Sequence, residues 1–235
     1  MSENSFKVIA GYKFFDLKNA AEIRFPLRKF CRDLGMRGTI LLSHEGVNSY
    51  LSGTHEAISK YLHHIHEELK FPRMDYKESV SHFQPFTRML VKVKKEIITM
   101  GFTDILPHEF TSPRISPETF KNWLDQNKEM TVLDTRNEYE IDFGKFKSAK
   151  DLKARSFKDF AKKAAEIPEE MKEKPVVMYC TGGIRCEKAS ALFLKKYNFK
   201  EVYQLDGGIL NYFNQIGSDH FEGKCFVFDN RIAVD

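Results

Sequence analysis

The sequence predicts an α/β chain built in two parts, an α+β domain followed by a domain with a parallel sheet. Its 235 residues exceed the roughly 150 of an average domain. Over residues 1–95, strand-like and helix-like stretches alternate in the order βαββαβ. Residues 104–117 hold three of the eight prolines, and beyond them strands are separated by helices, which is typical of a parallel sheet.

The first strand and helix follow from local signals. Apolar and aromatic residues fill positions 6–15 and predict a strand. Asp16 is placed to cap a helix that runs to about Leu34, where Gly35 ends it. Pro26 lies inside this segment and is expected to kink the helix or begin its second half.

A hairpin, a second helix and two more strands complete the first domain. Residues 39–43 and 47–51 predict two strands joined by a tight turn. Thr54 is the expected cap of a helix whose apolar residues recur at helical spacing. Strands follow near residues 74–76 and 89–93. This order indicates a ferredoxin-like, or acylphosphatase-like, sandwich of two helices on an antiparallel sheet.

The second domain is predicted over residues 116–217, after a linker at residues 96–115 and before a C-terminal tail at residues 218–235. Ser116 is placed to cap its first helix, with Pro117 in the first turn. The further expected elements are strands at residues 131–133, 175–179 and 201–204 and a helix at residues 184–196.

Composition indicates a soluble globular protein, with 42% hydrophobic and 30% charged residues. No stretch approaches the roughly 18 apolar residues of a membrane span. Residues 1–10 lack the features of a signal peptide, so we expect a cytoplasmic protein without a membrane partner. Four cysteines are too few for a disulfide scaffold, and a special cysteine is therefore expected to be chemically active.

The net charge of +4 is unevenly distributed. Residues 1–95 carry 16 Lys and Arg against 10 Asp and Glu, whereas residues 96–235 carry 21 against 23. Within the second part, residues 145–163 hold eight basic and two acidic residues. Such a cluster is either a solvated surface or a contact surface for a polyanion. The candidate RNA-binding residues in it are Lys150, Lys153, Arg155 and Lys158.

Cys180 is the candidate nucleophile, because it follows directly on a buried strand and precedes a helix. Reacting groups gather at the carboxyl ends of parallel strands, and a helix points its positive end at such a position. Gly182 and Gly183 allow the backbone to curl so that N–H groups point inward, and Arg185 adds a positive charge. We therefore predict a lowered pKa for the Cys180 thiol. The whole active-site loop is Cys180, Thr181, Gly182, Gly183, Ile184, Arg185 and Cys186.

Four stretches in the second domain resemble a rhodanese-type domain: residues 134–140, residues 144–149, the Cys180 loop and residues 206–209. The resemblance implies a sulfur-handling domain whose loop cysteine can carry a persulfide. It implies mainly structural roles for the charged residues Asp134, Arg136 and Glu140. It also implies that Gly207 and Gly208 lie beside the site.

The chain as a whole resembles the tRNA uridine hydroxylase family. The resemblance rests on residues 38–48, residues 92–100, the loop sequence CTGGIRC and residues 223–231. It implies hydroxylation of the wobble uridine of tRNA to 5-hydroxyuridine, with molecular oxygen as co-substrate and Cys180 as the catalytic residue. No further cofactor is evident, no metal site is expected, and the partner is tRNA rather than DNA.

Other functions fit the Cys180 loop as well. A plain sulfurtransferase would pass sulfur through a Cys180 persulfide, and a non-enzymatic protein would use Cys180 and Cys186 as a reversible thiol pair. By resemblance, the spacing of four residues between Cys180 and Arg185 argues against a phosphatase, whose loop is one residue longer. For a hydroxylase, addition of the thiolate to the uracil ring and reaction of a persulfide with oxygen both stay open.

Overall fold

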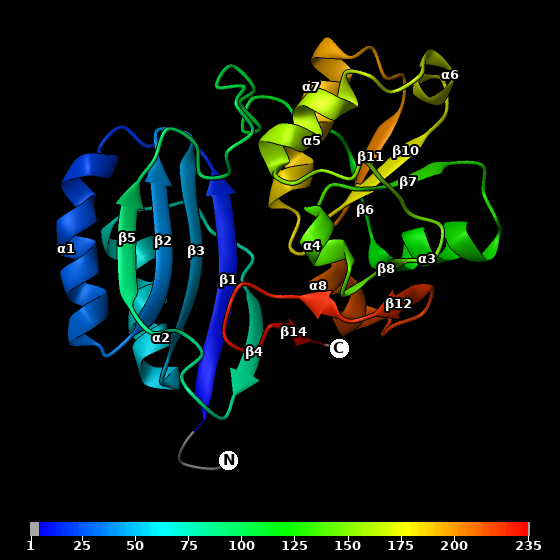
Figure 1. Cartoon of the computed structure of the whole chain (residues 1–235). Coiled ribbons are helices and arrows are strands. Elements are labelled where there is room, and N and C mark those ends of the chain that lie inside the picture. Colours follow the sequence, from blue (N-terminus) through cyan, green and yellow to red (C-terminus); the bar gives the residue numbers. More distant parts are fainter. Residues whose placement is uncertain (1–4, 235) are drawn as a thin grey trace. The chain divides into compact units, whose positions relative to one another are not determined.

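The computed structural model describes residues 5–234, and the chain divides into two compact units, Met1–Ile97 and Ile98–Asp235. The predicted fold class is confirmed: the first unit is an antiparallel α+β sandwich, and the second is built on a parallel sheet. Figure 1 labels most elements of both units.

The first unit has a five-stranded sheet in the order β4-β1-β3-β2-β5. The four strands from β4 to β2 pair antiparallel, as in a ferredoxin-like sheet, and β5 adds a parallel partner beside β2. Its elements are β1 (Phe6–Phe14), α1 (Ala20–Asp33), β2 (Arg37–Ser43), β3 (Gly46–Gly53), α2 (His55–His63), the π-helical turn η1 (His64–Glu68), β4 (Lys77–Ser81) and β5 (Met89–Val93).

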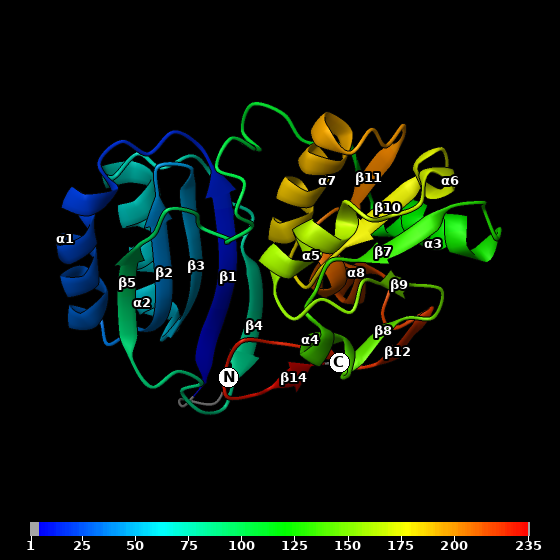
Figure 2. The same cartoon turned by 45° about the horizontal axis from the view of Figure 1, so that its top comes forward.

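One hydrophobic core holds both helices against the sheet of the first unit. Ile23, Leu27 and Cys31 recur every four residues on α1 and are all buried. They share a core with Ile40 and Leu42, which alternate along β2 and therefore point to the same face of the sheet. Figures 1 and 2 show α1 and α2 packed against this sheet.

The first unit departs from the prediction at two helix signals and one strand. Asp16 does not cap α1, which begins at Ala20, because the backbone around Asp16 is bonded to the β2–β3 turn, with the Leu17 N–H donating to the His44 carbonyl over 2.9 Å. Pro26 lies inside α1 without ending it. The strand expected near residues 74–76 lies instead at Lys77–Ser81, where it pairs with β1.

The second unit has a five-stranded parallel sheet in the order β6-β11-β10-β7-β9. Its elements are β6 (Arg114–Ile115), α3 (Pro117–Asp125), β7 (Thr131–Asp134), α4 (Glu138–Ile141), β8 (Gly144–Phe146), β9 (Lys150–Asp151), α5 (Phe157–Ala164), α6 (Glu169–Lys172), β10 (Val176–Tyr179), α7 (Ile184–Lys196), β11 (Val202–Leu205), α8 (Gly208–Gln215), β12 (Phe221–Gly223), β13 (Cys225–Phe226) and β14 (Ala233–Val234).

Strand β10 lies at the centre of this sheet and is buried on both faces. Val176 and Met178 pack into the core formed with α5 and α7, whereas Val177 and Tyr179 pack into the core formed with α3 and α8. This alternation follows from the two-residue period of a strand. Because helices cover both faces (Figure 2), the strand consists almost entirely of apolar residues.

Residues 98–115 of the stretch expected to be a linker belong to the second unit. Met100 and Ile105 are buried in its core, and β6 pairs with β11 at the edge of its sheet. The expected tail also packs on this unit, since β12 pairs with β8 and Cys225 is buried. Apolar residues at these positions remove both stretches from solvent. Within residues 5–234, no helix combines the length and apolar character that a membrane crossing requires.

Candidate active site

Cys180 lies at the carboxyl end of the central strand β10, and the next helix, α7, begins at Ile184. Side chains at this end of a parallel sheet face a natural binding region. The positive end of the α7 dipole points toward the loop and favours a negative charge there. The fold therefore places Cys180 where a thiolate is stabilised.

Backbone donors hold the sulfur of Cys180. The Gly183 N–H donates to Cys180 Sγ over 3.1 Å. Gly183 adopts a φ of 100°, in the left-handed region that favours glycine, and this conformation turns its amide inward. The inward curl predicted for the loop is thus present at Gly183.

The loop is seated on the start of α8 through Gly208. The Ile209 N–H donates to the Cys180 carbonyl over 3.0 Å, and the Leu210 N–H donates to the Thr181 carbonyl over 3.1 Å. Gly208 has a φ of +65°, and a Cβ there would lie 2.4 Å from the Cys180 carbonyl oxygen. Only glycine allows this close approach, and Gly207, also left-handed, precedes it as the cap of α8.

Opposing effects set the pKa of Cys180. Burial disfavours the charged form, but the hydrogen bond from Cys186, the charge of Arg185 and the N–H groups of Arg185 and Gly183 together lower the pKa from 9.0 to about 5. At neutral pH the residue is therefore a thiolate. The geometry supports the lowered pKa that the sequence predicts, and it adds Cys186 as the leading stabilising group.

Cys186 acts as a donor to Cys180 and keeps its own proton. Burial, followed by the interaction with Cys180, raises the pKa of Cys186 well above its usual range. Thr135, which follows β7, lies 3.6 Å from Cys186 Sγ through its hydroxyl, and this hydroxyl also donates to the Tyr179 carbonyl over 3.0 Å. Sequence reasoning missed Thr135, although its place at the carboxyl end of the neighbouring strand was a usable signal.

Arg185 is held by a buried carboxylate. Its two terminal nitrogens each donate to one oxygen of Glu140 over 2.6 Å, and both side chains are nearly inaccessible to solvent. Burial opposes the charge of Arg185, but Glu140 outweighs it and raises the pKa of the guanidinium. The bidentate pair fixes the guanidinium beside the loop, and this contact of Glu140 with Arg185 is one that the resemblance did not specify.

Asp134 and Arg136 form a second buried ion pair, below the site. Arg136 Nη2 donates to Asp134 Oδ2 over 2.7 Å and to the Gly144 carbonyl over 2.7 Å. These bonds tie the end of β7 to β8. Among the hydrogen bonds of residues 5–234, none joins either side chain to Cys180, and the structural role that the resemblance implies for them stays a prediction.

The sulfur of Cys180 is enclosed in this conformation. Cys180 is 0% exposed and Thr181 is 8% exposed, whereas Gly182 and Ile184 are half-buried. A Cβ built on Gly182 would meet no atom within 4 Å, so the open side of the loop lies there. A reacting molecule reaches the sulfur only when the residues that cover it move.

The basic cluster begins at the same end of the sheet. Strand β9 is parallel to β7, with Asp151 opposite Asp134, so the chain after Asp151 leaves the sheet on the side of the Cys180 loop. Lys150, Lys153, Arg155 and Lys158 are all exposed. Lys153 Nζ lies 3.4 Å from Asp151, which removes part of the cluster's charge. Among residues 5–234, no three side chains of His, Cys, Asp or Glu are grouped to hold a metal ion.

Comparisons with known proteins agree with this geometry. Residues 6–97 match the UPF0176 acylphosphatase like domain, and residues 116–215 match the rhodanese-like domain. The chain is 42% identical to the "tRNA uridine(34) hydroxylase" of Ralstonia nicotianae over 97% of its own length and 82% of the relative. The protein of that name from Thiobacillus denitrificans is 42% identical over 96% of this chain and 93% of the relative. The chain therefore belongs to the tRNA uridine(34) hydroxylase family.

Proposed function

We propose that this protein hydroxylates uridine 34 of tRNA at carbon 5 of the base and forms 5-hydroxyuridine, with Cys180 as the catalytic residue. The observation that carries the proposal is the match with tRNA uridine(34) hydroxylases, which spans both units and includes the Cys180 loop. The stabilised thiolate supports it, because the reaction needs a nucleophile at neutral pH. A tRNA substrate implies that the enzyme works in the cytoplasm.

Two routes begin from the Cys180 thiolate. The thiolate adds to the electron-poor carbon of the uracil ring beside carbon 5. Alternatively, it first attacks the outer sulfur of a donor such as thiosulfate, which leaves as sulfite, and the resulting persulfide reacts with oxygen. In both, the C–H bond at carbon 5 is replaced by C–OH. Molecular oxygen supplies that oxygen atom, and its second atom leaves as water. This balance consumes two electrons and two protons, and we assign them to a thiol reductant.

The test is the 5-hydroxyuridine content of tRNA in cells that depend on this protein for the modification. Nucleoside mass spectrometry should find 5-hydroxyuridine with the unaltered protein and none with Cys180→Ser. Cys31→Ser is the matched control, because Cys31 is buried in the core of the first unit. Unchanged 5-hydroxyuridine in the Cys180→Ser strain would overturn the proposal.

Sulfur transfer is the second candidate, because the donors around Cys180 Sγ would also stabilise the terminal sulfur of a persulfide. Incubation with thiosulfate should then leave a persulfide on Cys180, detected by mass spectrometry of the peptide. Thiosulfate:cyanide turnover at background level, with no persulfide, would remove this candidate.

We further propose that Lys150, Lys153, Arg155 and Lys158 contact tRNA phosphates. Their exposure, and their place at the Cys180 end of the sheet, support this role. Replacing all four with Glu should weaken tRNA binding and flatten its dependence on salt, by up to about 0.7 to 0.9 in the log–log slope per contact. An unaltered slope would make the cluster an ordinary solvated surface.

A further inference from the structure

A depression of about 450 Å³ in the first unit is lined by arginines from three segments of the chain. Arg28 and Arg32 come from the C-terminal half of α1, Arg37 begins β2, and Arg88 directly precedes β5. We call these four residues the arginine groove. They are separated by up to 60 positions in the sequence, so the groove exists only in the folded unit.

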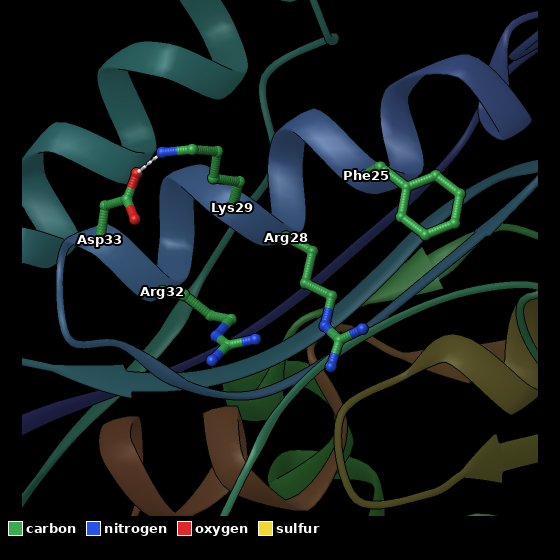
Figure 3. Close-up of a pocket in the computed structure, with 5 residues that line it drawn as sticks. All are labelled: Phe25, Arg28, Lys29, Arg32 and Asp33. Carbon is green, nitrogen blue, oxygen red and sulfur yellow. Dashed lines mark hydrogen bonds and ion pairs between the residues drawn. The ribbon is translucent and has the colours of Figure 1, made fainter.

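The charge of the arginine groove is not neutralised by the residues that the structure describes. Across residues 5–234, none of its four members takes part in an ion pair. The acid that lies nearest along the chain, Asp33, is bound by Lys29 over 2.6 Å. Figure 3 shows Asp33 turned toward Lys29, while Arg28 and Arg32 extend away from that pair.

This arrangement of arginines destabilises the folded protein when no ligand is bound. Arg28 and Arg32 are four residues apart on one helix, and like charges at this spacing repel. The Nε atom of Arg28 is buried without a hydrogen-bond partner in the described part of the chain, and an unsatisfied buried donor destabilises a fold. An anion seated in the groove would offset the repulsion between these like charges.

The orientation of the groove is partly fixed by the backbone. Arg37 Nη1 donates to the Phe86 carbonyl over 3.5 Å, which holds this side chain toward the segment that carries Arg88. The four arginines therefore line the depression from α1 on one side and from β2 and the start of β5 on the other. Guanidinium groups bind phosphate oxygens with two parallel hydrogen bonds, so such a pair of walls suits phosphates.

An exposed aromatic ring adjoins the groove. Phe25 is 64% exposed and lines a neighbouring depression together with Arg28 and Arg32 (Figure 3). The guanidinium of Arg24 lies over its ring, 4.8 Å from the centroid. Aromatic rings beside basic grooves provide stacking surfaces for nucleic-acid bases. An acidic protein has no such bases, so the exposed ring favours a nucleic acid as the partner.

We infer that the arginine groove binds the phosphodiester backbone of tRNA and that Phe25 stacks on an unpaired base. RNA as the partner rests on the proposed function, whereas the anion-binding character rests on the four arginines. The site lies wholly within the first unit, so this unit contributes substrate binding in addition to the cysteine chemistry of the second. It also accounts for part of the basic excess of residues 1–95.

The test uses the full-length protein and measures binding of unmodified tRNA by fluorescence anisotropy at several salt concentrations. Arg32→Ala with Arg88→Ala removes two exposed side chains of the groove. The matched control is Lys60→Ala with Arg73→Ala, which removes two exposed charges of the same unit that are each ion-paired with a glutamate. Thermal unfolding of both proteins verifies that the fold is retained.

Each lost phosphate contact lowers the log–log slope by about 0.7, so the two lost contacts lower it by about 1.4. If the two proteins bind equally at 1 M salt, we expect the groove variant to bind tRNA roughly 25-fold more weakly at 0.1 M salt. The control should bind like the unaltered protein. Arg32→Lys with Arg88→Lys keeps the charge and should preserve the slope. Phe25→Leu, which keeps an apolar side chain but loses the ring, should weaken binding at least about fivefold at every salt concentration.

Equal binding by the groove variant and its control would overturn the inference. It would also be overturned if polyglutamate displaced tRNA as effectively as competitor RNA does at the same concentration of negative charge. The proposed function is judged separately, by 5-hydroxyuridine content. Cys180→Ser should abolish the modification and leave tRNA affinity unchanged. Loss of binding in the groove variant therefore supports the inference even where no hydroxylation is found.

Discussion

The hydrogen bond from Cys186 to Cys180 offers a direct test of how this fold stabilises a thiolate. Cys186→Ala removes the donor, which is the leading contribution that lowers the pKa of Cys180. A hydrogen bond to a charged group contributes about 1.5–3 kcal/mol. At about 1.4 kcal/mol per pKa unit, its loss should raise the pKa by about one to two units. The midpoint should move from about 5 to between about 6 and 7.

The ultraviolet absorbance of the thiolate measures this midpoint without any need for a reagent to reach the buried sulfur. The difference between each protein and the same protein with Cys180→Ser isolates the Cys180 signal. Cys186→Ser is the matched control, since serine leaves a similarly small side chain and keeps a hydroxyl donor. Its midpoint should stay close to that of the unaltered protein.

A midpoint for Cys186→Ala within about 0.3 units of the unaltered value would refute this reasoning, because that difference is below about 0.5 kcal/mol. The N–H groups of the loop and the charge of Arg185 would then suffice to hold the thiolate. Cys186 would be a packing residue whose sulfur happens to lie beside Cys180.

Three further outcomes are expected. Gly208→Ala should destabilise the protein by about 2 kcal/mol or more in chemical denaturation, because the new Cβ overlaps the Cys180 carbonyl, whereas Gly182→Ala faces open space and should leave stability nearly unchanged. Glu140→Gln should cost about 3 kcal/mol, since it leaves the buried Arg185 charge unpaired; an effect below about 1 kcal/mol would show that the pair contributes little. The folded Cys180 pKa of about 5 lies below its ordinary 9.0, so the stability of the unaltered protein relative to Cys180→Ser should rise with pH between these values and be lost as pH falls toward 5. If the difference in the free energy of unfolding between the two proteins did not change with pH, Cys180 would not be a thiolate at neutral pH.

Local patterns predicted the elements that carry the chemistry. The apolar run before Cys180, the two glycines after it and the helix that begins at Ile184 are adjacent in the sequence, and each has a strong conformational preference of its own. Ser116 and Thr54 cap their helices as predicted, because the hydroxyl and the amide that it accepts from are only three residues apart. Such short-range features can be predicted without knowledge of the fold.

Competition between local preference and tertiary contacts explains the failures. Asp16 has the chemistry of a helix cap, but the backbone beside it bonds to the β2–β3 turn and delays the start of α1. Residues 96–115 have the prolines of a linker, yet Met100 and Ile105 become part of a core and β6 joins a sheet. Burial of apolar surface outweighs these weak local signals.

The sequence by itself determined the fold class, the cysteine at the end of β10 and the family to which the chain belongs. Only the tertiary structure decided which groups act on that cysteine, since Glu140 reaches Arg185 across 45 positions and Thr135 reaches Cys186 across 51. The arginine groove also depends on the tertiary structure, because its four residues come from segments far apart in the sequence. Electrostatic and hydrogen-bond energies depend on distance in space, and that distance is set by how strands and helices pack rather than by their order in the chain.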